Sequence, residues 1–220
     1  MSELSRKRQR ASHEPSRLYS MRRRELLKAA ADVFHSRGLS QASLTEISQT
    51  LNVDRATLYY YFGSKTQLFR AVILESIETV VAQAQSVSSA PGTARSRLSA
   101  LISQVVVSFD THYPALHVFV QEDMRRLPCD AIPDPDQQRL AQLADFFMDT
   151  MERLIAEGVD AGEFRDLGDA RVLALIIQGS LNWMHRWFDP QGEQDAASIA
   201  RIICAVFLDG LVAVAPASDA

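Results

Sequence analysis

The sequence predicts an all-α fold, and three observations support this prediction. Apolar residues recur at three- and four-residue spacing along almost every long segment, as they do on one face of a helix. No stretch combines alternating apolar and polar residues with flanking turn residues, as a half-buried strand would. Glycine and proline gather between the periodic segments, where they end helices. With 220 residues, 47% of them hydrophobic, the chain can also bury a sizeable core.

Charge is distributed unevenly along the chain. Residues 1–70 hold 13 Lys and Arg and 6 Asp and Glu, which gives a net charge of +7. Residues 71–220 hold 10 and 21, which gives −11. Such asymmetry indicates a segment that binds a polyanion, attached to a part with another task. Charge alone also fits a solvated N-terminal face with a disordered tail.

The first seventy residues predict an arm and four helices. Residues 1–19 are polar and basic, which predicts a flexible arm. A helix should run from about Ser20 to Arg37 and end at Gly38, because glycine is favoured just past a helix C-terminus. The next three helices are expected to begin at Ser43 (with Glu46 completing a capping box), at Arg55 after an Asp54 cap, and at Lys65 after Ser64 with Gln67.

The rest of the chain predicts about five more helices, separated by proline and glycine. These helices are expected near residues 94–111, 115–126, 136–157, 169–188 and 195–214. We therefore expect three parts: a basic arm (1–19), a first helical part (20–66) and a larger helical part (67–220).

The short helices on either side of Asn52 have the spacing of a helix-turn-helix, whose second helix enters the major groove of DNA. Asn52 tolerates the left-handed conformation that a tight turn needs. An arginine at the start of the second helix, Arg55, can read guanine through two hydrogen bonds, and tyrosines can contact phosphate, sugar or a thymine methyl group. Lys65, at the next helix N-terminus, suits a phosphate, although surface decoration would also explain it, and Tyr59 could instead pack partly in the core. The expected DNA-facing residues are Ser43, Thr45, Arg55, Ala56, Thr57, Tyr59, Tyr60, Tyr61 and Lys65.

Three stretches together resemble the N-terminal domain of the tetracycline-repressor (TetR) family: LLKAAADVFHSRG at residues 26–38, SLTEISQTL at 43–51 and VDRATLYYYFGSKTQLF at 53–69. The chain departs from the usual family pattern at Asn52, Asp54 and Ala56, and has Tyr61 where histidine is common. The resemblance implies a homodimeric, ligand-responsive regulator, with a DNA-binding domain at residues 20–66 and a helical ligand-binding and dimerisation domain at residues 67–220. The DNA-facing positions that it implies are Ser43, Thr45, Arg55, Thr57, Tyr59, Tyr60, Tyr61 and Lys65. It also implies a repressor released from a palindromic operator by a small apolar effector.

In the resembling family the last two helices pair with those of a second copy as a four-helix bundle. The matching segments begin at Val172 and Ile199 and are apolar around much of their circumference, as expected for helices buried on two sides. Gly179, Ser180 and Ala205 would permit close helix approach. A single monomeric helical core is the alternative.

A candidate effector site follows from aromatic and sulfur side chains in the second part of the chain, although most such residues pack in cores. Trp183 and Trp187 lie four residues apart, on one face of a helix, with Arg186 beside them. This segment looks like that of TetR members that respond to acyl-CoA thioesters; the alternative is that both tryptophans wedge the dimer bundle. The expected ligand-binding residues are Phe109, His117, Phe147, Met151, Trp183, Arg186 and Trp187.

Other function classes lack their sequence signals. We find no nucleophile with a base, no phosphate-binding or dinucleotide loop, and no metal-ligand spacing, so we expect no enzyme, metal or cofactor. Two cysteines and the absence of a long apolar run fit a cytoplasmic protein without a membrane span. The alternative function is a nonspecific DNA-binding architectural protein, which would contact phosphates only.

Overall fold

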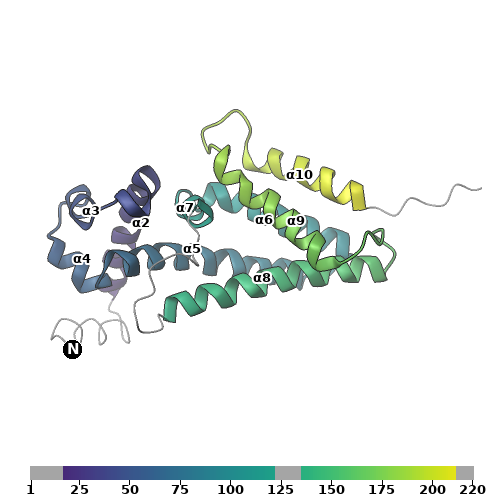
Figure 1. Ribbon diagram of the computed structural model, residues 1–220, viewed down its shortest axis with the longest axis horizontal. Coiled ribbons are helices and arrows are strands. Elements are labelled where there is room, and N and C mark those ends of the chain that lie inside the picture. Colours follow the sequence, from purple (N-terminus) through teal and green to yellow (C-terminus); the bar gives the residue numbers. More distant parts are fainter. Residues whose placement is uncertain (1–16, 122–134, 212–220) are drawn as a thin grey trace, which may run out of the picture. The chain divides into compact units, whose positions relative to one another are not determined.

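The computed structural model describes residues 17–121 and 135–211, which form helices joined by short connections (Figure 1). No extended strand occurs in these two ranges, and the predicted all-α fold is confirmed. No helix in the described ranges is both long and apolar enough to cross a lipid bilayer. The predictions for residues 1–16, 122–126 and 212–214 lie outside the described residues. The helices are α2 (Arg17–Gln41), α3 (Leu44–Thr50), α4 (Arg55–Phe62), α5 (Lys65–Ser88), α6 (Ala94–Thr111), α7 (Ala115–Gln121), α8 (Pro135–Asp160), α9 (Ala170–Asn182), the 3₁₀ helix η2 (Trp183–Arg186) and α10 (Ala196–Leu211).

The chain divides into two compact units. The first comprises residues 1–76 and 114–139, and the second comprises residues 77–113 and 140–220. The first unit contains α2, α3, α4 and α7, and the second contains α6, α9, η2 and α10. Helices α5 and α8 each contribute residues to both units. The first unit thus extends past residue 66, where the sequence places the end of the DNA-binding domain.

Helix α2 supplies much of the apolar core of the first unit. Leu26, Ala30 and Phe34 are fully buried, and their four-residue spacing puts them on one stripe of the helix. The ring of Phe34 meets that of Phe69 on α5 edge to face, with 5.1 Å between centroids. Regular helical geometry breaks at Gly38, where φ is 73°, a conformation that side chains with a Cβ rarely adopt. The predicted end of the regular helix at Gly38 is therefore confirmed.

Serine side chains cap the N-termini of two helices in the first unit, as the sequence predicts. The Ser43 hydroxyl accepts a hydrogen bond from the backbone N–H of Glu46 at 3.1 Å, and Ser64 accepts one from Gln67 at 3.1 Å. The predicted reciprocal half of the Ser43 box is replaced by an ion pair, because the Glu46 carboxylate turns to Arg37 at 3.1 Å. Each serine satisfies one backbone donor that the helix start would otherwise leave unpaired.

The turn between α3 and α4 is closed by backbone geometry. Asn52 has a φ of 50°, which confirms its predicted left-handed conformation. The N–H of Val53 donates to the carbonyl of Ser48 at 2.9 Å. Asp54 stands at the predicted cap position of α4, but its side chain makes no capping bond; its backbone carbonyl accepts from Thr57 N–H at 2.9 Å. The turn thus relies on Asn52 more than on the Asp54 carboxylate.

In the second unit, α6 and α10 lie side by side, and α8 is long (Figure 1). Leu98, Leu101 and Ile102 on α6 are fully buried, as is Leu154 on α8. Packing near the end of α8 is tight: a Cβ added to Gly158 would come within 2.2 Å of the Phe164 ring.

A half-buried ion-pair network joins three helices of the second unit. Arg97 on α6 contacts Glu157 on α8 at 2.6 Å and donates to the Ser88 carbonyl at the end of α5 at 3.3 Å. Arg153 contacts the other oxygen of Glu157 at 2.6 Å. Hydrogen bonds from Arg153 and then Arg97 lower the pKa of Glu157 below its usual value, although partial burial opposes this. The carboxylate therefore stays charged at neutral pH.

Candidate functional site

Helix α4 presents a polar and aromatic surface that the core does not use. Leu58 and Phe62 point inward and are buried. Arg55, Ala56 and Tyr59 are exposed, and the other predicted DNA-facing residues of this helix, Thr57, Tyr60 and Tyr61, are half-buried. The structure therefore brings all six predicted positions of α4 to the surface, fully or in part.

Arg55 and Tyr59 are coupled on this surface, one helical turn apart. The guanidinium of Arg55 donates a hydrogen bond to the Tyr59 hydroxyl at 3.2 Å, and its carbon lies 5.8 Å from the centre of the Tyr59 ring. Tyr59 is 42% exposed, so it is not a core residue. This contact holds the arginine side chain near the start of α4.

The beginning of α3 adds a second exposed patch to the same unit. Ser43 and Thr45 are both exposed. The Ser43 oxygen accepts the Glu46 N–H, so the Ser43 O–H remains a donor suited to a phosphate oxygen.

Lys65 has a role in the structure that the sequence did not indicate. Its ammonium group donates to the backbone carbonyls of Leu39 at 2.8 Å, Ala42 at 3.0 Å and Ser40 at 3.3 Å. These three carbonyls belong to the end of α2 and its connection to α3, so Lys65 ties that connection to the start of α5. A phosphate at this helix start would share the ammonium group with the three carbonyls.

The predicted effector residues fall into different environments. Phe109, Phe147 and Met151 are buried in the second unit. The Phe109 ring lies edge to face with Phe188, with centroids 6.4 Å apart. His117 instead belongs to α7 in the first unit, where its ring meets that of His35 edge to face at 4.7 Å.

The predicted arrangement of the two tryptophans changes because the α-helix ends before them. Helix α9 stops at Asn182, and residues 183–186 form a 3₁₀ helix, in which positions three apart are aligned. The guanidinium carbon of Arg186 accordingly lies 5.2 Å from the centre of the Trp183 ring. Trp187, with a φ of −139°, has left the helix. The expectation that both tryptophans share one face of an α-helix is therefore wrong; Trp183 shares its face with Arg186.

Large apolar side chains are exposed on α9, around η2 and on α10 in the second unit. Isoleucine, leucine and valine side chains on α9 and α10 are more than half exposed, and Trp183 and Trp187 are 58% and 52% exposed. We call these side chains together the apolar surface. Gly179, Ser180 and Ala205 are exposed on the same helices. Large apolar surfaces of this kind usually mark an interface. The aliphatic members of the surface are Val172, Leu175, Ile176, Ile202 and Val206.

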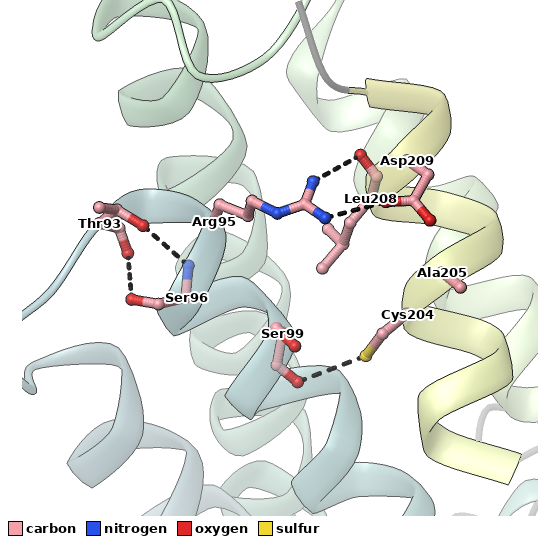
Figure 2. Close-up of a pocket in the computed structure, with 8 residues that line it drawn as sticks. All are labelled: Thr93, Arg95, Ser96, Ser99, Cys204, Ala205, Leu208 and Asp209. Atoms are coloured by element: carbon pink, nitrogen blue, oxygen red, sulfur yellow. Dashed lines mark hydrogen bonds and ion pairs between the residues drawn. The ribbon is translucent and has the colours of Figure 1, made fainter. Parts of the chain in front are cut away.

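A pocket of about 370 Å³ opens between the N-terminal turns of α6 and helix α10 (Figure 2). Arg95 crosses it, donating to the Leu208 carbonyl at 3.0 Å and pairing with Asp209 at 2.9 Å. Cys204 Sγ lies 3.6 Å from the Ser99 carbonyl oxygen. Five of its eight lining residues are polar, and none of the seven predicted ligand-binding residues belongs to it. Its residues are Thr93, Arg95, Ser96, Ser99, Cys204, Ala205, Leu208 and Asp209.

Solved structures share this fold over most of their length. The ketosteroid transcriptional regulator KstR2 of Mycobacterium tuberculosis superposes with a TM-score of 0.79 at 21% identity, covering 88% of this chain and 96% of that one. AibR, solved with isovaleryl coenzyme A and operator DNA, gives a TM-score of 0.72 at 20% identity, covering 84% and 97%.

Sequence comparisons give the family. The HTH-type transcriptional repressor KstR2 of Mycolicibacterium smegmatis is 27% identical over 194 residues, which are 86% of this chain and 90% of that protein. The profile "Bacterial regulatory proteins, tetR family" matches residues 26–72, and the profile "Tetracyclin repressor-like, C-terminal domain" matches residues 91–211. These matches confirm the prediction that the chain is a transcription regulator and not an enzyme. The protein belongs to the tetR family of bacterial regulatory proteins.

Proposed function

We propose that this protein is a homodimeric repressor that binds a near-palindromic operator through α4 and leaves it when an acyl-CoA binds. The observation that carries the proposal is the outer surface of α4, which presents a guanidinium group and tyrosine rings from the positively charged part of the chain. We expect this action in the cytoplasm, where the operator DNA lies.

Within this proposal, Arg55 reads a base and the remaining residues of the surface position the helix. Arg55 stands at the N-terminal end of α4, the end that faces base edges in helix-turn-helix proteins. Ala56 and Thr57 are short enough to let the helix approach the bases, and Tyr59 holds the arginine through its hydroxyl and ring. Ser43 and Thr45, with Tyr60, Tyr61 and the helix start at Lys65, contact phosphates and sugars.

The exposed apolar surface on α9 and α10 supports the homodimer. A helix-turn-helix reads only a few base pairs, so a second copy on the adjoining half-site is needed for specificity. Gly179 and Ala205 are small and exposed, and permit close approach of the helices of a second copy. We propose that these helices form a four-helix bundle with their mates.

Two groups of side chains in the second unit, and one solved relative, support an acyl-CoA effector. Trp183 and Arg186 combine an aromatic face with a guanidinium group, which suits an adenine ring and phosphate groups. Phe109, Phe147 and Met151 are apolar and buried, and an acyl chain would have to separate such residues to enter the helical core. The likeness to AibR, which was solved with an acyl-CoA, supports the same ligand class.

Release follows from linkage between the two ligands. If an acyl-CoA binds the form with wrongly spaced α4 helices more tightly, it lowers DNA affinity, and DNA lowers acyl-CoA affinity by the same factor. A coupling of about 1–3 kcal/mol would change operator affinity about 5- to 150-fold.

Selection of bound sequences from random duplex DNA, with and without acyl-CoA, tests the proposal. We expect a symmetric consensus with two half-sites, and weaker recovery when isovaleryl-CoA or a long-chain acyl-CoA is present. Coenzyme A without an acyl group and the Arg186→Ala variant serve as controls, and both should leave recovery nearly unchanged. Steep salt dependence without any consensus would contradict the repressor and support the architectural alternative.

A further inference from the structure

The first turns of α2 lie ahead of the segment that matches the tetR profile, which begins at residue 26. Tyr19 stands in these turns, although composition alone assigned it to the basic arm. Its ring stacks on that of Tyr61 of α4, with centroids 4.7 Å apart and planes 26° from parallel. The same ring meets Tyr60 edge to face at 6.3 Å. The part of α2 outside the matched segment therefore contacts the proposed DNA-reading helix.

Two of the tyrosines also contact each other, so the three rings form one cluster. Tyr60 and Tyr61 meet edge to face at 5.2 Å. Burial raises the pKa of Tyr61, and the neighbouring Tyr60 raises it further, so the Tyr61 hydroxyl stays protonated at neutral pH. A protonated hydroxyl can donate to a phosphate oxygen.

The cluster is not needed to build the core of the first unit. Tyr19, Tyr60 and Tyr61 are each only half-buried, whereas the core is made by fully buried residues such as Leu26 and Phe34. A tyrosine ring on an exposed helix face can adopt more than one rotamer. Stacking on Tyr19 limits that choice, and a side chain fixed before binding loses less freedom when it meets DNA.

A cationic side chain from the same turns also contacts α4. The Arg23 guanidinium carbon is 5.5 Å from the centre of the Phe62 ring at the end of α4. Both Arg23 and Tyr19 thus join the start of α2 to the second half of α4.

We propose that Tyr19 is a positioning residue for DNA binding, which acts by holding the rings of Tyr60 and Tyr61 in the orientation that contacts the DNA backbone. This inference rests on the proposed operator binding. It extends the DNA-reading unit to turns of α2 that precede the matched family segment.

The test compares Tyr19→Ala and Tyr19→Phe with the wild-type protein, using the operator duplex recovered by selection. We expect Tyr19→Ala to weaken binding about tenfold without changing the consensus, because backbone contacts carry no sequence information. Tyr19→Phe keeps the ring and should bind like the wild type. Met21→Ala is the matched control, since Met21 is 52% exposed on the same turns, and it should leave binding unchanged.

A double-mutant cycle separates positioning from direct contact or loss of folding. If Tyr19 acts through its neighbours, Tyr19→Ala should weaken binding no further when Tyr60 and Tyr61 are already alanine. Equal loss in Tyr19→Phe and Tyr19→Ala, or a full tenfold loss that persists in the triple variant, would overturn the inference. Wild-type affinity for Tyr19→Ala would overturn it as well. Failure of the wild-type protein to prefer any sequence would instead contradict the proposed function itself.

Discussion

Helix α4 in the first unit and helices α9 and α10 in the second both present side chains to solvent, but of different kinds. Helix α4 exposes an arginine and tyrosines, in a part of the chain with a net charge of +7. Helices α9 and α10 expose aliphatic side chains, in a part with a net charge of −11. The first surface suits a polyanion and the second suits another apolar surface. Under the proposed function, the two partners, DNA and a second copy, therefore bind to separate units of the chain.

A charge placed on the apolar surface is expected to have the largest effect on binding. Val206 is 67% exposed on α10, and Val206→Asp would bury an unpaired carboxylate in the proposed bundle. We expect the dimer to dissociate and affinity for a full operator to fall at least about 100-fold, because two half-sites would no longer be bound together. Sedimentation velocity and DNA titration measure both effects. Val107→Asp, on α6 at 40% exposure, is the control, and equal losses in the two variants would argue against the proposed interface.

On the exposed surface of α4, Arg55→Ala should remove base reading while leaving the dimer intact. We expect a loss of about 1–3 kcal/mol, confined to one base position in each half-site. Tyr59→Phe should cost less, because the ring remains under the guanidinium group while the hydroxyl acceptor is lost. Competition between operator variants measures the preference at each position. An Arg55→Ala protein with the wild-type preference would refute the role given to Arg55.

Substitution of Lys65 tests how much the stability of the first unit depends on its internal hydrogen bonds. Lys65→Met removes three donors to backbone carbonyls, and we expect the free energy of unfolding to fall by about 1–3 kcal/mol. Binding should weaken nearly alike for all sequences, since no base contact is lost. Denaturant unfolding gives the stability, with Lys28→Met, an exposed change on α2, as the control. Unaltered stability of the Lys65 variant would indicate that its ammonium group serves DNA alone.

The smallest effect is expected for the ion pairs of Glu157 in the second unit, whose contribution to stability depends on pH. The folded pKa of Glu157 lies below its unfolded value of about 4.3, so its ion pairs stabilise the fold above that pH. This contribution is lost as the pH falls through the folded pKa. We expect Glu157→Gln to lower the unfolding temperature by about 1–3 °C at pH 7 and much less near pH 3. An equal shift at both pH values would mean that the carboxylate charge is not the cause.

The helix-turn-helix could be predicted because its signals lie within short stretches of sequence. Ser43 and Glu46 are three residues apart, and Asn52 can adopt the left-handed conformation, with a φ of 50°, that its turn requires. Each feature depends on neighbours along the chain, so composition and spacing were enough to place it.

Other features could not be predicted because they depend on residues far apart in sequence. Lys65 reaches carbonyls 23 to 26 residues earlier, and the Tyr19 ring meets residues more than forty positions later. The change from α- to 3₁₀-helix after Asn182 realigned Trp183 with Arg186, and no glycine or proline stands at that point to signal it. The effector site has the same difficulty, since its walls depend on how several helices pack.

The proposed function depends on a fixed spacing between two copies of α4, which the second unit maintains. Its most direct test is the binding of the intact protein to the selected operator and to the same duplex with five base pairs inserted between the half-sites. The insertion rotates one half-site by about half a turn of DNA. We predict two protomers per operator and a loss of affinity of at least tenfold on insertion. Equal affinity for both duplexes, or one protomer bound to each, would contradict a dimer that holds its two α4 helices at a fixed spacing.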